Sequence, residues 1–251
     1  MGRILILGGT AEARRLAERL AGRADVILSL AGRTASPAAQ PVPVRVGGFG
    51  GAEGLARYLA AERIDVLVDA THPYAAKISA NAARAVERAG TPLVALRRPL
   101  WRAIDGDRWI AVADVGEAVR ALGGAPRRVF LALGRNELAP FAAAPQHHYL
   151  VRSVDPVDPP LEVPHAVYVT GRGPFAEAED RALLERHGID LIVAKNSGGA
   201  ATYGKIAAAR ALHLPVIMLR RPALPAVAAV ATVEEALAWL DHATSAAARG
   251  V

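Results

Sequence analysis

The stretch RILILGGTAEARRLA, Arg3–Ala17, decides the fold class of this chain. A short apolar run meets two glycines and passes directly into a helical pattern, which is the strand–turn–helix start of an α/β domain. Gly8 and Ala13 match the first and last positions of the dinucleotide-binding pattern G-x-G-x-x-G/A, whereas Thr10 stands in place of its second glycine. The stretch therefore predicts an α/β domain and leaves a dinucleotide site open.

Short apolar strand patterns alternate with helical patterns along the whole chain. We predict strands at Arg3–Leu7, Asp25–Leu30, Val42–Val46, Asp65–Asp69, Pro92–Arg97, Trp109–Val112, Val129–Leu133, Tyr149–Ser153, Ala166–Thr170, Asp190–Lys195, Pro215–Leu219 and Ala226–Val230. We predict helices at Ala11–Ala21, Ala52–Glu62, Ala75–Ala89, Val115–Leu122, Ala176–His187, Tyr203–Leu212 and Val233–His242. Such alternation is typical of parallel sheets built from βαβ units.

The chain also repeats itself at an offset of about half its length. DVLVDA…PLVALRRP (65–99) has a counterpart in DLIVAK…PVIMLRRP (190–222), and the similar phrases VADVGEAVRAL (112–122) and VATVEEALAWL (230–240) follow the two copies. The repeat predicts two Rossmann-like domains, 1–124 and 125–251, with parallel sheets that face an inter-domain cleft. The boundary is expected at GGAP, Gly123–Pro126, which breaks the helix before it. Which sheet the strand at Trp109–Val112 joins is left open.

The composition narrows the function. The 251 residues contain no cysteine, which excludes disulfides, thiolate metal sites and cysteine nucleophiles and suits a cytoplasmic enzyme. The chain has no apolar run of membrane-spanning length and no signal-peptide pattern, so we expect no membrane partner. Lys and Arg number 30 against 24 Asp and Glu, while aromatic residues make up only 5%. An arginine-rich solvated surface explains this balance, and a small polyanionic substrate explains it better than nucleic acid does.

The end of the second predicted strand indicates the cofactor. Dinucleotide folds place an acidic residue there for the ribose of NAD, or a basic residue for the 2′-phosphate of NADP. The stretch VILSLAGRT (26–34) has no acidic residue and offers an arginine, whose guanidinium can bind phosphate oxygens bidentately. We therefore predict an NADPH site formed by Gly8, Gly9, Thr10, Ala11, Ser29, Arg33, Thr34, Gly47, Gly48, Thr71 and His72.

Two further loops at strand ends, GRGPF (171–175) and KNSGG (195–199), are rich in glycine and cations. Lys195 ends an apolar strand, where a charge is costly without a partner. We predict that an anionic substrate is bound by Arg14, Lys77, Arg172, Lys195, Asn196, Ser197 and Lys205. The catalytic residue stays unassigned, with His72, Tyr74 and a water molecule as alternative proton donors. The sequence contains no HExxH motif and no Cys/His ligand cluster, so we predict no metal site.

The motifs ILGGTAEARRLA, SLAGRT, VRVGGFGG, DATHPYAAKISANA, GRGPF, KNSGG and KIAAAR before PVIMLRRP together resemble the precorrin-6A reductase family of cobalamin biosynthesis, including its cobalt-precorrin-6A branch. The resemblance implies NADPH-dependent reduction of one double bond of a tetrapyrrole that carries many carboxylates. It also implies that hydride goes to ring carbon C19 and a proton to the neighbouring C18.

The resemblance leaves open whether the substrate contains cobalt. It also leaves open the oligomeric state, a monomer included. Two other functions stay open as alternatives: an NADP-binding sensor without turnover, and an NADPH-dependent dehydrogenase of a smaller anionic metabolite. The sensor is expected to bind NADPH and leave it unoxidised. The small-substrate enzyme has less need of so many basic residues in the second half of the chain.

Overall fold

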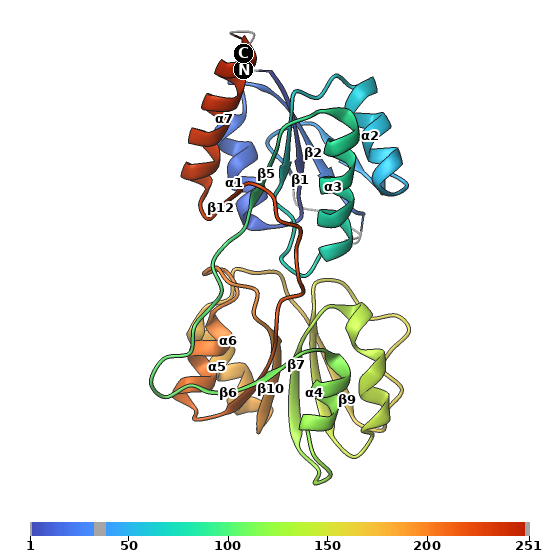
Figure 1. Cartoon of the computed structure of the whole chain (residues 1–251). Helices are drawn as coiled ribbons and strands as arrows, with labels where there is room; N and C mark the ends of the chain where they lie inside the picture. The colour runs from blue at the N-terminus through green and yellow to red at the C-terminus, as the bar shows by residue number, and fades with distance from the viewer. Residues whose placement is uncertain (1, 33–38, 249–251) are drawn as a thin grey trace. The chain divides into compact units, whose positions relative to one another are not determined.

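The computed structural model describes residues 2–32 and 39–248, whose course Figure 1 shows. The chain forms two compact units: unit 1 comprises Met1–Pro99 and Pro222–Val251, and unit 2 comprises Leu100–Arg221. Each unit contains a six-stranded sheet in which neighbouring strands run parallel. The predicted α/β class with two Rossmann-like parallel sheets is confirmed.

Unit 1 is a parallel sheet with helices on both faces. Its strand order is β12-β5-β4-β1-β2-β3, which is the 3-2-1-4-5-6 order of dinucleotide-binding folds. The strands are β1 (Arg3–Leu7), β2 (Asp25–Leu30), β3 (Val44–Val46), β4 (Val66–Asp69), β5 (Leu93–Leu96) and β12 (Ala229–Val230). Helices α1 (Ala11–Leu20) and α7 (Val233–Ala248) cover one face, and α2 (Gly51–Ala61) and α3 (Ala76–Ala89) cover the other (Figure 1).

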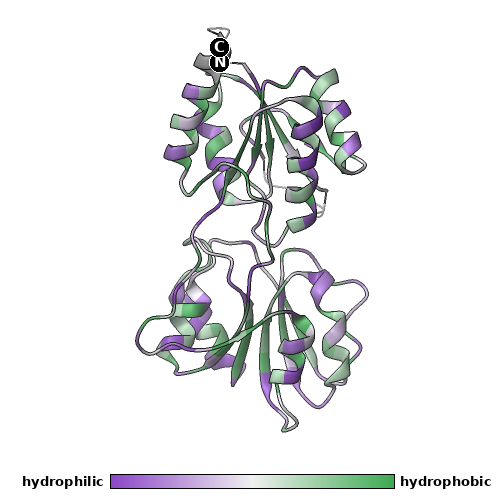
Figure 2. Cartoon of the chain, viewed as in Figure 1, coloured by the Kyte–Doolittle hydropathy of each residue, from purple (hydrophilic) through white to green (hydrophobic). Residues whose placement is uncertain are grey.

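The core of unit 1 follows from the two-residue alternation of its strands. Ile4 and Ile6 pack among the buried residues of α1 and α7, whereas Leu5 and Leu7 pack among those of α2 and α3. Successive strand side chains point to opposite faces of a sheet, so an unbroken apolar run supplies two cores at once. Figure 2 shows much of the strands of both units in the hydrophobic colour.

The strands of unit 2 lie in the order β9-β8-β7-β10-β11-β6. This is the same order as in unit 1 if β7 is taken as the first strand and β6 as the sixth. The strands are β6 (Arg108–Val112), β7 (Arg128–Ala132), β8 (His148–Ser153), β9 (Ala166–Thr170), β10 (Leu191–Lys195) and β11 (Pro215–Leu219). Helices α5 (Glu177–Arg186) and α6 (Gly204–Ala211) cover one face, and α4 (Val115–Ala121) contacts β11 and the short helix η2 (Ala139–Ala143). A further short helix, η1 (Arg135–Glu137), follows β7. Every predicted strand and helix is present, and the two short helices were not predicted.

Each sheet takes its sixth strand from the other half of the chain. β6 follows β5 in the sequence but pairs with β11, and β12 follows β11 but pairs with β5. The predicted domains 1–124 and 125–251 are therefore wrong, because the chain passes between the units after Pro99 and after Arg221. The two strand–helix phrases have the same pattern, so the sequence alone does not assign each of them to its sheet.

Candidate active site

The turn between β1 and α1 forms the first part of the site in unit 1. In a sheet of this strand order, ligands bind beyond the carboxyl ends of the first and fourth strands, here β1 and β4. Thr10 Oγ1 accepts a hydrogen bond from the Ala13 amide (3.1 Å) as the N-cap of α1, and donates one to the Ala70 carbonyl (2.8 Å). Thr10 therefore joins the two strand ends. Because the first amides of a helix lack intrahelical partners, the start of α1 at Ala11 offers an anion site beside this junction.

Two turns that contain glycine allow a ligand to approach the backbone closely at this edge of unit 1. The φ angles of Gly9 (+108°) and Gly47 (+115°) favour glycine, and a Cβ added at either residue would meet nothing within 4 Å. Arg45 holds the second turn, since its guanidinium donates to the carbonyls of Gly47 (2.6 Å) and Gly48 (2.8 Å) and lies 3.8 Å from the centre of the Phe49 ring. Arg45 was not among the predicted site residues, and its place before the glycines is the signal that the sequence offers for it.

A hydrogen-bonded cluster follows β4. Thr71 Oγ1 donates to the carboxylate of Asp69 (2.7 Å), which is only 5% exposed. His72 Nδ1 accepts a hydrogen bond from the Tyr74 amide (3.3 Å), and the two rings lie 5.7 Å apart. This bond places the proton of a neutral imidazole on Nε2, so His72 can donate a hydrogen bond through that atom. Thr71 and His72 thus lie at the same strand edge as the turn at Thr10.

Other predicted cofactor ligands are placed less favourably or lie outside the described residues. Ser29 is 5% exposed and its carbonyl accepts a hydrogen bond from the Gly8 amide (2.9 Å), so it joins β2 to the turn after β1 and presents little of its hydroxyl. Arg33 and Thr34 lie outside the described residues.

Two of the predicted substrate ligands, Arg14 and Lys77, belong to unit 1. Both are exposed, on α1 and α3 respectively. Arg14 forms an ion pair with Glu18 one turn along its helix (2.9 Å). Exposed pairs of this kind are weak, so Arg14 can exchange Glu18 for another carboxylate at little cost.

In unit 2, Lys195 ends β10, beside β7, where the strand order reverses. Its ammonium forms an ion pair with Glu137, which lies in η1 directly after β7. The two side chains are 14% and 30% exposed, so the lysine is partly buried and has a carboxylate partner within the chain. Glu137 was not among the predicted site residues, because 58 residues separate it from Lys195.

The loop GRGPF in unit 2 lies against the segment between β10 and α6. The Phe175 amide donates to the Ala201 carbonyl (3.0 Å), and a Cβ added at Gly204 would lie 2.6 Å from the Phe175 carbonyl oxygen. The guanidinium of Arg152 lies 3.8 Å from the centre of the Phe175 ring. Arg172 is exposed in this loop. The structure therefore brings together two of the loops in which substrate ligands were predicted.

Comparison with known proteins identifies the family. The family model described as "Precorrin-6x reductase CbiJ/CobK" matches residues 3–241. The chain belongs to the precorrin-6x reductase family. A precorrin-6A reductase of Sinorhizobium sp is 59% identical over 242 residues, which are 96% of this chain and 93% of the relative. The solved structure of "CobK precorrin-6A reductase" is 51% identical, with a TM-score of 0.94 over 97% of each chain. A cobalt-precorrin-6A reductase of Priestia megaterium is 28% identical over 254 residues, 96% of this chain and 99% of the relative.

In this member of the precorrin-6x reductase family, three of the predicted substrate ligands point into unit 2. Asn196 and Ser197 are each 8% exposed, and Lys205 is 4% exposed. Lys205 Nζ donates to the Thr202 carbonyl (2.6 Å) and lies 5.2 Å from the centre of the Trp101 ring. The side chain of Asn196 pairs with the backbone of Trp101. These residues shape the loop after β10, and the prediction that they contact substrate directly fits their burial poorly.

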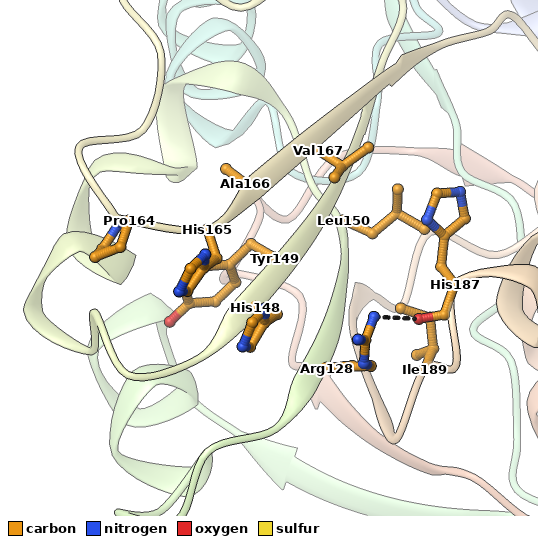
Figure 3. A pocket seen from close by; sticks show the side chains of 10 residues that line it. All are labelled: Arg128, His148, Tyr149, Leu150, Pro164, His165, Ala166, Val167, His187 and Ile189. Carbon is orange, nitrogen blue, oxygen red and sulfur yellow. Dashed lines mark hydrogen bonds between the residues drawn. The ribbon is translucent and has the colours of Figure 1, made fainter.

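A hollow of about 270 Å³ opens at the other end of the sheet in unit 2 (Figure 3). It is lined by Arg128, His148, Tyr149, Leu150, Pro164, His165, Ala166, Val167, His187 and Ile189. Arg128 and His148 begin β7 and β8, so the hollow lies at the amino ends of the strands. The rings of His148 and His165 stack with centres 4.2 Å apart. In this reductase the hollow is therefore separate from the candidate active site.

Metal and membrane contacts were also predicted to be absent. Within residues 2–32 and 39–248, no group of three or more His, Asp or Glu side chains is arranged to hold a metal ion. In the same ranges, none of the helices has the length and apolar character needed to cross a bilayer.

Proposed function

We propose that the chain reduces precorrin-6A to its 6B dihydro form in cobalamin biosynthesis, with NADPH as the reductant. As a member of the precorrin-6x reductase family it is an oxidoreductase that acts on a CH–CH group, and such reductases use a nicotinamide cofactor. The observation that carries the cofactor proposal is the junction at Thr10. The helix start, the positive-φ glycine before it and the first and fourth strands of the sheet all meet there.

The residues of unit 1 fit a dinucleotide. Gly8, Gly9 and the start of α1 at Ala11 would hold its phosphates, because the backbone at Gly9 is open and helix amides attract anions. We propose that Arg33 pairs with the 2′-phosphate, an assignment that rests on the sequence alone. Gly47, Gly48, Thr71 and His72 complete the proposed set at the same strand edge.

The substrate needs several cations, since its rim carries many carboxylates. We propose that Lys195 and Arg172 of unit 2 bind these carboxylates, with the exposed Arg14 and Lys77 of unit 1 as further ligands. When bound, NADPH supplies the hydride that is added at C19, and a proton is added at C18. The proton comes from His72 through Nε2, from Tyr74 or from water. Apart from this proton transfer, the work of the chain is to place the two reactants.

We propose that the natural substrate is the metal-free macrocycle. This choice is supported by sequence identity, which is 59% to a relative named for precorrin-6A and 28% to one named for cobalt-precorrin-6A. The choice is tested by measuring kcat/KM for precorrin-6A and for its cobalt form, each supplied separately at equal concentration. We expect a higher kcat/KM for the metal-free compound, and a higher value for the cobalt form would contradict the choice.

The activity is tested with purified chain, precorrin-6A and NADPH. We expect NADPH oxidation in step with a change in the absorbance spectrum of the macrocycle, and much slower oxidation of NADH. Tight NADPH binding without turnover would instead support the sensor. Turnover only with a smaller carboxylated or phosphorylated metabolite would support the dehydrogenase alternative.

A further inference from the structure

The KNSGG loop, residues 195–199, begins with the last residue of β10 and is held by the segment through which the chain enters unit 2. The indole Nε1 of Trp101 donates to the Gly199 carbonyl (2.9 Å). The backbone of Trp101 pairs with the side chain of Asn196, whose Oδ1 accepts from the Trp101 amide and whose Nδ2 donates to the Trp101 carbonyl, both at 2.9 Å. Trp101 thus contacts the loop at its second and its last residue.

The segment through which the chain leaves unit 2 holds the same loop. Arg221 donates through Nε to the Asn196 carbonyl (2.9 Å) and through Nη2 to the Ser197 carbonyl (3.0 Å). Arg221 is the last residue of unit 2, and Trp101 is the second residue of it. Two residues that are 120 positions apart in the sequence, 101 and 221, therefore fix one five-residue loop.

The loop needs this external support. Gly198 and Gly199 have φ angles of +67° and +73°, which glycine adopts at little cost. Because glycine restricts the backbone so little, the loop would have many other conformations if nothing held it. Residues 196–199 lie outside β10 and α6, so their carbonyls have no ladder or helix partners, and the side chains of Trp101 and Arg221 satisfy three of them. Lys195 directly precedes the residues that are held in this way.

We propose that Trp101 is a positioning residue for Lys195. Trp101 fixes the far end of the loop and so holds Lys195 where a substrate carboxylate binds it. Arg221 has the same role from the segment through which the chain leaves unit 2. This inference rests on the proposed function in one respect, that Lys195 binds the carboxylates of precorrin-6A. Trp101 itself does not contact substrate in this role.

The first test is Trp101→Phe, with Trp109→Phe as a matched control. The phenylalanine keeps an aromatic ring beside Tyr203, 5.5 Å away in the native protein, but removes the donor to the Gly199 carbonyl. Trp109 is a partly buried tryptophan of the same unit, and within the described part of the chain its indole nitrogen has no hydrogen-bond partner. We expect the KM for precorrin-6A to rise about tenfold in Trp101→Phe, as for one lost buried hydrogen bond, and the KM for NADPH to stay unchanged. Trp109→Phe should change neither value.

A double-mutant cycle separates positioning from a general loss of structure. If Trp101 acts through Lys195, Trp101→Phe should have little further effect on KM once Lys195→Ala is present. Equal effects of Trp101→Phe in the presence and absence of Lys195 would overturn the proposal. Arg221→Gln provides a second variant should Trp101→Phe fold poorly, and the same non-additivity with Lys195→Ala is expected.

Hydrogen exchange of the loop amides, measured without substrate, tests the holding of the loop separately from the reaction. We expect faster exchange at residues 196–199 in Trp101→Phe and Arg221→Gln than in the native chain or in Trp109→Phe. If precorrin-6A is turned over but loop exchange is unchanged, the positioning role is wrong. If exchange accelerates but the native chain does not reduce precorrin-6A, the proposed function is wrong and the fixed loop must serve another ligand.

Discussion

Lys195 and Glu137 form an ion pair across the point where the strand order of the unit 2 sheet reverses. Thr10 and Ala70 form the matching contact in unit 1, a hydrogen bond of 2.8 Å from Thr10 Oγ1 to the Ala70 carbonyl. The same position in the two sheets is therefore bridged by different interactions. In unit 1 the bridge is a hydrogen bond between neutral groups, and in unit 2 it is an ion pair. In the proposed complex a substrate carboxylate takes the place of Glu137 at Lys195, so that one ion pair is exchanged for another.

Lys195→Ala is expected to raise the KM for precorrin-6A while turnover at saturating substrate is retained, because we assign the lysine to binding. One lost charge-assisted hydrogen bond is worth about 1.5–3 kcal/mol, or roughly 10- to 150-fold in affinity. Substrate affinity and single-turnover hydride transfer are measured on the same variant. Glu137→Gln is the control, since it keeps the ammonium and should not raise KM. Intact affinity with transfer slowed by about 10²–10⁴-fold would make Lys195 the proton donor instead.

Arg33→Ala is expected to weaken NADPH binding much more than NADH binding, because only NADPH carries the 2′-phosphate. The loss should be roughly 10- to 150-fold for NADPH. Titration of both cofactors into the native chain and the variant measures it. An equal loss for both cofactors, or no loss for either, would show that Arg33 does not read the phosphate.

Thr10→Ala is expected to lower the free energy of unfolding by about 1 kcal/mol or more, because it removes the N-cap of α1 and the contact with Ala70. The affinity for NADPH should fall as well, since the start of α1 loses the hydrogen bond that joins it to Ala70. Denaturant unfolding and cofactor titration are the measurements. Thr10→Ser keeps the hydroxyl and should behave like the native chain. Equal behaviour of the Ala and Ser variants would remove Thr10 from the site.

His147 is expected to make the chain less stable as the pH falls. It is fully buried, and the pKa of its imidazole lies below the ordinary value of 6.5, mainly because burial disfavours the charged form. A hydrogen bond to the Gly123 backbone opposes this shift, and the charge of Arg127 adds to it. Below about pH 6.5 the unfolded chain gains a proton that the native chain accepts only at lower pH. Stability should therefore be lost from about pH 6.5 down through the native pKa.

Denaturant unfolding at about pH 7.5 and about pH 5 measures this loss. His147→Gln should show a smaller drop between the two pH values than the native chain, since it removes the titrating group. His242→Gln, at an exposed histidine on α7, is the control for the exchange of a histidine for glutamine. An undiminished drop in His147→Gln would assign the pH dependence to other groups.

Because β6 pairs within unit 2 and β12 within unit 1, the structure predicts which fragments of the chain fold. Residues 100–221 contain all six strands of unit 2 and should fold alone, as judged by a cooperative thermal transition. Residues 1–124 lack α7, whose Val233, Ala236, Leu237 and Leu240 are buried against the sheet of unit 1, and should not fold cooperatively. A cooperative transition for 1–124 together with none for 100–221 would contradict the assignment of β6 and β12.

The sequence by itself determined the α/β class, the strands and helices and the loops at their ends. These follow from local signals: apolar runs such as β1, helical periodicity such as that of α1, and glycines at turns such as Gly9. The motif at Thr10, together with the other short motifs, also indicated the right family, because the residues of each motif are contiguous in the chain.

Only the tertiary structure decided which sheet β6 and β12 join, which carboxylate pairs with Lys195 and which polar residues of the loop after β10 point inward. Glu137 is 58 residues from Lys195, and Trp101 is 95 residues from the Asn196 side chain that it binds. Contacts of this kind depend on which distant segments meet, and the two strand–helix phrases are too similar in pattern for the sequence to assign each to its sheet. Local periodicity contains no information on that choice, so the connecting segments and the packing they permit had to supply it.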